Sequence, residues 1–321
     1  MADGIFHKTD GHNTVPSQKF QHPDITADGS ERAHVHLSRL ETLWVNTGTL
    51  CNIECAHCYI KSSPTNDTLV YLREDELAPY LAEAKTMGAH EIGFTGGEPF
   101  MNPDALAMIE AALRQGFDVL VLTNAMRPMM RERVKSALIA LKQTYGDKLR
   151  LRISLDHFDP ALHDEERGQG SFDIARDGLA WLCANKFSLS IAARLRWGDD
   201  EKTMRDGFAA FLATLNAQID PYAPEDLILF PEMDETSDIP EITTECWDIL
   251  KVSPDAMMCA TSRMLVKRKG ASEPVVLACT LLAYDQAFEL GTTLNDASTP
   301  VKLNHPHCAQ FCVLGGASCS G

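Results

Sequence analysis

Segments of strand character alternate with segments of helical character through most of the chain. The alternation recurs at intervals of about 30 residues, which is typical of parallel βα units. Six such units predict an α/β fold with an open, curved (βα)6 sheet, a partial TIM-like barrel whose functional residues lie at the carboxyl ends of the strands. Strands are expected over 43–47, 91–95, 117–122, 149–154, 188–195 and 226–230, and helices over 74–87, 103–115, 131–145, 172–185 and 202–215.

The pattern changes on both sides of this region. Residues 1–38 are polar and lack periodicity, which predicts an N-terminal arm that is either loose or draped over the surface. We expect the barrel core over 39–240 and a Cys-rich C-terminal domain over 241–321, which begins with a short helix at 243–250. A chain of 321 residues is long enough for one large domain with a small appendage.

Charge and hydropathy exclude several classes of protein. The chain has 45 acidic against 29 basic side chains, a formal net charge of −16 at pH 7, which disfavours nucleic-acid binding. It has no apolar run of about 18 residues, so we expect no membrane span. The N-terminus lacks the basic start and apolar stretch of a secretory signal, which predicts a cytoplasmic protein in which disulfides are rare.

The ten cysteines are unevenly distributed, and three of them follow the first expected strand within eight residues. Cys51, Cys55 and Cys58 have the spacing C-x3-C-x2-C, and clustered thiols in a reducing compartment indicate a metal site. Three thiolates can hold three irons of a cubane cluster and leave the fourth iron open to a small molecule. A zinc site with His57 as the fourth ligand is the alternative.

Further motifs follow the next three strands in the same way. They are Thr95-Gly96-Gly97-Glu98-Pro99, Leu122-Thr123-Asn124, and Ser154-Leu155-Asp156 with His163-Asp164 and Arg167-Gly168 behind it. With the three cysteines before them, these motifs resemble those of the radical S-adenosylmethionine (radical SAM) enzymes, in particular the SPASM/twitch branch. The resemblance covers residues 43–235.

The resemblance implies a [4Fe–4S] cluster on Cys51, Cys55 and Cys58 with SAM bound beside it. In the family, the Gly96, Gly97 and Glu98 motif binds the amino group of SAM. Carried over in the same way, Ser154 contacts the ribose and Arg167 the carboxylate, with Asn124 and Asp156 in the same cofactor site. A surface ion pair is the alternative for Asp156 and Arg167. The chain departs from the family pattern at His57, usually aromatic, and at Ala125 and His157, usually glycine.

A second group of cysteines lies after the barrel, at Cys259, Cys279, Cys308, Cys312 and Cys319. Two strands joined by a turn at Gly270 would bring Cys259 and Cys279 together. The arrangement is similar to the auxiliary-cluster extensions of the SPASM/twitch branch. Five thiols suffice for one auxiliary [4Fe–4S] cluster but not for two, and the spacing leaves open which of Cys308, Cys312 and Cys319 is the extra one. His305 and His307 are alternative ligands, and a structural zinc site is the alternative to the cluster.

The two remaining cysteines, Cys183 and Cys246, occur in apolar helical contexts and are interpreted as packing residues.

The resemblance implies an oxidoreductase that reductively cleaves SAM to a 5′-deoxyadenosyl radical. The radical would abstract hydrogen from a peptide or small-molecule substrate, with an electron donor such as flavodoxin or ferredoxin. Arg194, Arg196 and residues 230–234 are candidates to meet the substrate. The alternative is a non-catalytic iron–sulfur or zinc scaffold that kept the fold, against which the Gly96-Gly97-Glu98 motif and Ser154 argue.

Overall fold

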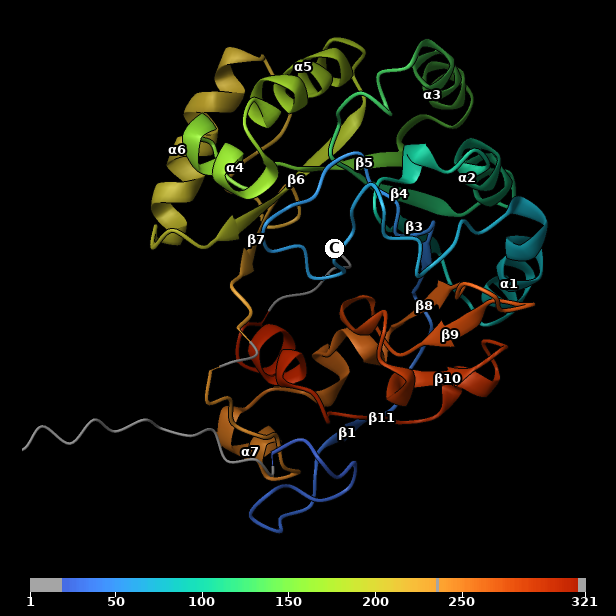
Figure 1. Ribbon diagram of the computed structural model, residues 1–321, viewed down its shortest axis with the longest axis vertical. Helices are drawn as coiled ribbons and strands as arrows, with labels where there is room; N and C mark the ends of the chain where they lie inside the picture. The colour runs from blue at the N-terminus through green and yellow to red at the C-terminus, as the bar shows by residue number, and fades with distance from the viewer. Residues whose placement is uncertain (1–18, 235–236, 317–321) are drawn as a thin grey trace, which may run out of the picture.

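The computed structural model describes residues 19–234 and 237–316, and its centre is one nine-stranded sheet (Figure 1). Six neighbouring strands of that sheet are parallel and follow one another in chain order. They confirm the predicted open (βα)6 arrangement. These strands are β2 (Thr42–Asn46), β3 (Glu91–Thr95), β4 (Asp118–Thr123), β5 (Leu149–Ser154), β6 (Ser188–Leu195) and β7 (Leu227–Pro231).

Helices cover the outside of the arc that these strands form (Figure 1). The five expected helices are present as α1 (Glu74–Thr86), α2 (Ala105–Arg114), α3 (Glu132–Tyr145), α5 (Ser171–Ala184) and α6 (Glu201–Thr214). A further helix, α4 (Pro160–Arg167), was not predicted. The Asp159 carboxylate caps it by accepting from two backbone amides, Pro160 occupies its first turn, and Gly168, at φ 98°, ends it.

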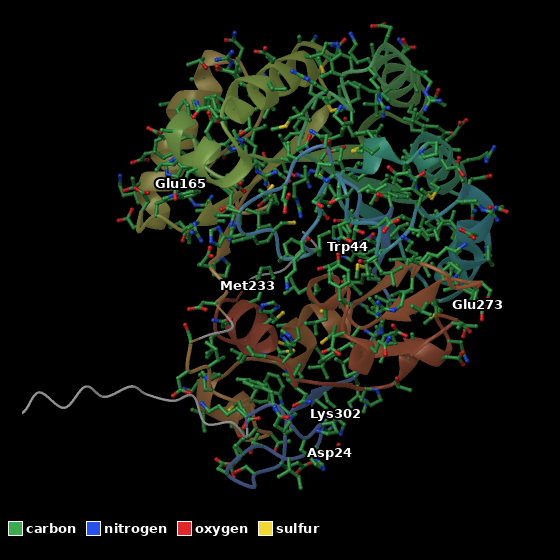
Figure 2. All side chains as sticks on the ribbon, in the orientation of Figure 1. Asp24, Trp44, Glu165, Met233, Glu273 and Lys302 are labelled. Atoms are coloured by element: carbon green, nitrogen blue, oxygen red, sulfur yellow. The ribbon has the colours of Figure 1, made fainter. Side chains whose placement is uncertain are left out.

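Alternate residues of the strands face two different cores. Leu43 and Val45 of β2 belong to the outer core beneath the helices, whereas Trp44 belongs to the inner core together with Met264. Trp44 pairs with Gly93 of β3, and a Cβ atom at Gly93 would lie 2.4 Å from the indole ring. The inner face therefore accepts a fully buried tryptophan because its neighbour has no side chain (Figure 2).

The C-terminal part of the chain extends the barrel sheet. Strand β8 (Ser262–Val266) pairs parallel with β2, and β9 (Val275–Leu277) pairs antiparallel with β8, which confirms the hairpin expected between Cys259 and Cys279. Strand β10 (Glu289–Gly291) completes that edge. Helix α7 (Cys246–Leu250) is shorter than the expected segment 243–250.

Part of the polar N-terminal segment is tightly packed. Strand β1 (His34–Val35) pairs with β11 (Val301–Lys302), and the fully buried Arg32 side chain binds Glu241 and donates to three backbone carbonyls. Residues 1–18 of the expected arm lie outside the described residues, and the division of the chain at residue 240 stays a prediction. Within 19–234 and 237–316, no helix is both long and apolar enough to cross a membrane.

Gly178 on α5 provides a test of this packing. A Cβ atom at Gly178 would lie 1.9 Å from the carbonyl oxygen of Ala125, which is backbone and cannot rotate away. We expect Gly178→Ala to lower the free energy of unfolding by about 1–3 kcal/mol, although alanine is intrinsically the better helix former by about 1 kcal/mol. Urea unfolding measures the change, and Asp177→Ala, at the exposed neighbouring position, is the control. A Gly178→Ala variant as stable as the parent would contradict the expected clash.

Candidate functional site

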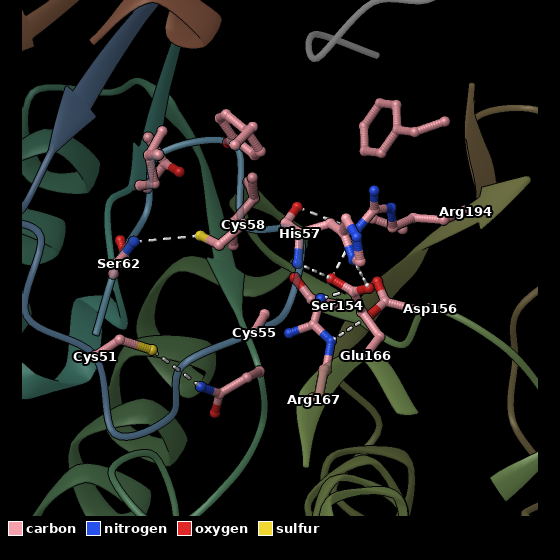
Figure 3. A pocket seen from close by; sticks show the side chains of 18 of the residues that line it. Cys51, Cys55, His57, Cys58, Ser62, Ser154, Asp156, Glu166, Arg167 and Arg194 are labelled. Carbon is pink, nitrogen blue, oxygen red and sulfur yellow. Dashed lines mark hydrogen bonds and ion pairs between the residues drawn. The ribbon is translucent and has the colours of Figure 1, made fainter. Parts of the chain in front are cut away.

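The loop that follows β2 places three cysteines inside the arc of strands, where they line a pocket (Figure 3). The pocket spans about 1150 Å³ when the solvent at its open mouth is included. Its polar lining comes largely from the strand-end motifs that the sequence identified. The motif residues in the lining are Cys51, Cys55, Cys58, Thr95, Gly96, Gly97, Thr123, Asn124, Ser154, Asp156 and Arg167.

Two glycines hold the end of β3 against the start of the cysteine loop. A Cβ atom at Gly97 would lie 2.2 Å from the Leu50 carbonyl oxygen, and Gly96 has a φ of +137° that disfavours any side chain. The Gly97 amide donates to the Gly48 carbonyl at 2.8 Å. Glycine is therefore required at both positions by contact between two backbones, and both residues also line the pocket.

Glu98 lies behind this turn, with 1% of its surface exposed. Its carboxylate accepts from the Thr123 hydroxyl at 2.9 Å and from the Asn124 amide at 2.9 Å, so it joins the end of β3 to the end of β4. Burial raises the pKa of Glu98 to about 7, against the opposing effect of these hydrogen bonds. Direct contact between Glu98 and SAM stays a prediction, because the structure places the carboxylate outside the pocket lining.

The end of β4 reaches the first cysteine through Asn124. Its Nδ2 donates to Asn52 Oδ1 at 2.9 Å and lies 3.9 Å from Cys51 Sγ. Ala125, where the resembled family has glycine, has a φ of 57°, so the chain keeps the left-handed turn without the glycine. His157, at the other such position, has its ring buried against Trp197.

Asp156 and Arg167 form a buried, bidentate ion pair in the pocket wall, not the surface pair considered as the alternative. Arg167 Nε and Nη2 donate to the two carboxylate oxygens at 2.5 and 3.0 Å. Burial opposes ionisation of Asp156, yet the Arg167 guanidinium outweighs it and holds the pKa of Asp156 below its usual value. Ser154, two residues before Asp156, lines the same wall.

The three thiols suit an iron–sulfur cluster with an open iron. Burial raises the pKa of Cys51 to about 12 and that of Cys55 to about 11, so both are protonated at neutral pH unless a metal displaces the proton. His57 is engaged through both ring nitrogens, by Glu166 and by Arg196, which leaves a set of three thiol donors. Within the described ranges, no group of three His, Cys, Asp or Glu side chains is placed to bind a single metal ion. A cubane does not require such a group, because each of its cysteines binds a separate iron.

Four of the five C-terminal cysteines line a second cavity of about 400 Å³. Cys259 and Cys279 flank the β8–β9 hairpin, and Cys308 and Cys312 lie on a π-helical turn. The buried Arg263 donates to the Cys259 carbonyl at 2.6 Å and fixes that end of the cavity. Cys319 lies outside the described residues.

The alternative ligand His307 also lines this second cavity, and its ring lies 4.6 Å from that of His305. Cys183 packs against the outer core and Cys246 against the inner core, in agreement with their interpretation as packing residues.

Glu166 is the site residue that the sequence analysis missed. It lies on α4, lines the pocket and binds both His57 and Arg194. The available signal was its position three residues after His163, because both side chains are buried on one face of the helix. Arg194 and residues 230, 231 and 233 line the pocket as expected. Arg196 is outside the lining but contacts His57, which is part of it.

Comparison with known proteins identifies several similar chains. The family described as the radical SAM superfamily matches residues 45–213 and confirms the predicted resemblance. The antilisterial bacteriocin subtilosin biosynthesis protein AlbA of Bacillus subtilis (strain 168) is 37% identical over 123 residues, 38% of this chain and 26% of AlbA. GTP 3',8-cyclase of Limosilactobacillus fermentum is 31% identical over 157 residues, 47% of this chain and 45% of the cyclase.

The structure of Streptococcus suis SuiB bound to the precursor peptide SuiA resembles this one with a TM-score of 0.59 at 15% identity, covering 82% of this chain and 66% of SuiB. At that identity the likeness concerns the fold. The matched segment spans less than half the length of AlbA and of the cyclase.

The raised pKa of Glu98 predicts a pH-dependent contribution to stability. The folded chain keeps this proton up to about pH 7 whereas the unfolded chain releases it near 4.5, so stability falls as the pH rises between these values. We expect the unfolding free energy of the parent, relative to Glu98→Gln, to decline by up to about 3 kcal/mol from pH 4.5 to 8. Anaerobic urea unfolding at both pH values measures this, and a difference that does not change with pH would contradict it.

Proposed function

The chain belongs to the radical SAM superfamily, and from this premise we propose that it cleaves SAM reductively and uses the resulting 5′-deoxyadenosyl radical to abstract hydrogen from a peptide, as one step of an oxidative modification. One observation carries the proposal. Three thiols on one loop, of which Cys51 is buried, share a pocket with residues of the three further strand-end motifs. A cluster at these thiols would supply the electron that cleaves the sulfonium of SAM.

The residues around the pocket would then have distinct tasks. Cys51, Cys55 and Cys58 would hold the cluster, and the backbone at Gly96 and Gly97 would face the amino end of SAM. Arg167 uses two of its five N–H donors on Asp156, so its other donors, on Nη1 and Nη2, would be left for the SAM carboxylate.

At the other end of SAM, the Ser154 hydroxyl would meet the ribose, with Asn124 beside it. Glu98 would act indirectly, because its carboxylate holds together the turns that follow β3 and β4.

The second cavity supports an auxiliary [4Fe–4S] cluster. We propose that Cys259, Cys279, Cys308 and Cys312 supply the four thiolates that a fully ligated cluster requires, with Cys319 as the extra thiol. Leu281 lines both this cavity and the pocket, so the two sites adjoin. We propose that this arrangement receives the electron left on the product, which favours an oxidative reaction.

A peptide is the favoured substrate for two reasons. The part of the pocket away from the strand-end motifs is apolar, lined by Phe230, Pro231, Met233, Leu281 and Phe311, which suits a side chain more than a charged nucleotide. Among the relatives, AlbA acts in bacteriocin biosynthesis and SuiB was solved with a precursor peptide. The proposal includes an electron donor such as flavodoxin or ferredoxin and a cytoplasmic location.

Iron content and SAM cleavage test the proposal together. After anaerobic reconstitution we expect about eight irons per chain and formation of 5′-deoxyadenosine with a reductant. Cys51→Ala or Cys58→Ala should remove about four irons and abolish cleavage, and Cys308→Ala should remove the other four. Cys183→Ala and Cys246→Ala are matched controls that should keep both clusters.

Two outcomes would count against this function. A Cys58→Ala chain that still cleaves SAM would overturn the role of the first thiol set. A parent chain with four irons or fewer and no 5′-deoxyadenosine would instead support the non-catalytic iron–sulfur or zinc scaffold.

A further inference from the structure

One residue, Glu166, makes three hydrogen bonds to the segment between the second and third cysteines, one through its backbone and two through its carboxylate. The backbone oxygen of Glu166 accepts from the Ala56 amide at 2.8 Å. Its Oε1 accepts from the His57 amide at 2.8 Å, and its Oε2 lies 2.9 Å from His57 Nδ1. The Glu166 side chain is 2% exposed and the His57 side chain 45% exposed, so a buried carboxylate holds a half-exposed imidazole (Figure 3).

Two arginines from β6 and the residue that follows it complete the enclosure of His57. Arg194 donates to Glu166 Oε1 at 2.8 Å and to the His57 carbonyl at 3.2 Å. Arg196 lies 3.0 Å from His57 Nε2. Glu232 accepts from both guanidinium groups, at 2.8 and 2.9 Å, and so fixes their positions. The amide, the carbonyl and both ring nitrogens of His57 are therefore all hydrogen-bonded.

These partners determine which ring nitrogen of His57 carries the proton. A guanidinium only donates hydrogen bonds, so His57 Nε2 accepts from Arg196 and carries no proton. The proton then resides on Nδ1, which donates to Glu166 Oε2. The orientation of the His57 ring thus depends on its hydrogen bond to the Glu166 carboxylate.

We infer that Glu166 is a positioning residue that shapes the segment from Cys55 to Cys58 before iron enters, so that the thiols are presented in the geometry that the cluster needs. The inference rests on the proposed cluster at Cys51, Cys55 and Cys58. A free loop would lose conformational entropy when it binds the cluster, and its thiolates repel one another. Glu166 reduces the first of these costs by fixing the backbone at Ala56 and His57 in advance.

Glu166→Gln tests this role with little change in shape. The new amide nitrogen replaces one of the two accepting oxygens, so it faces either the His57 Nδ1 or the donors of the His57 amide and Arg194. We expect the SAM-responsive cluster to lose iron to a chelator roughly tenfold faster or more, since a charge-assisted hydrogen bond is removed. Glu165→Gln, on the same helix but exposed, is the matched control and should match the parent (Figure 2).

The readout is the electron paramagnetic resonance signal that changes when SAM is added, followed during chelation. The auxiliary cluster serves as an internal standard, because its signal does not respond to SAM and its ligands lie elsewhere in the chain. Selective loss of the SAM-responsive signal supports the inference. Equal loss of both signals assigns Glu166 a general folding role and overturns it, as does a Glu166→Gln chain that loses iron at the parental rate.

A pair of variants at the half-exposed His57 keeps the test valid even where Glu166→Gln fails to fold. The amide nitrogen of asparagine occupies nearly the position of Nδ1, whereas that of glutamine occupies the position of Nε2. His57→Asn should therefore retain the bond to Glu166 and the parental rate of iron loss, and His57→Gln should accelerate it. Equal rates in the two variants would overturn the inference. A parent chain without a SAM-responsive signal would count against the proposed function instead.

Discussion

The contact between the backbones of Gly97 and Leu50 determines where the cysteine loop can run. Because no Cβ atom stands between them, the turn after β3 lies directly on the chain that leaves β2, and Glu98 donates its amide to the Leu50 carbonyl at 3.2 Å. The next residue along the loop is Cys51, whose position is thus tied to two strands. The other polar groups of the pocket lie around the loop that this contact positions.

Most buried carboxylates of the pocket are bonded to arginines, in one pair and in one larger network. Asp156 binds Arg167, and Glu166 binds Arg194, each with little exposure to water. In a site of low dielectric such pairs are rigid, because separating them would leave an unpaired buried charge. Glu98 has no such cation bonded to it and meets the same burial with a raised pKa and neutral donors. The arrangement gives a wall of fixed dipoles around the thiols and leaves little mobile charge beside them.

The barrel and its motifs were predictable because their signals are local. Strands 149–154 and 188–195 have the bounds that the sequence predicted. The apolar residues that define each strand lie within it, and the turn residues that end it lie next to it. Helix α4 was missed because its eight residues are mostly polar, and the pairing of β8 with β2 joins segments about 220 residues apart that no local pattern connects. The site divides in the same way. The cysteines and strand ends were predicted, whereas the burial of Glu166 beside the exposed Glu165 depends on which face of an unpredicted helix meets the loop.

The C-terminal part of the chain contributes to the walls of both cavities, which links their shapes. Tyr284 donates its hydroxyl to the Ile60 carbonyl at 2.5 Å and accepts from Asn66, so it fixes the chain that follows Cys58. Leu281, three residues earlier, stands between the pocket and the cavity of the second thiol set. Displacing this segment would therefore move a pocket wall, the support of the first cysteine loop and the approach to the second site together. The shapes of the pocket and of the second cavity thus depend on one short stretch of packed backbone.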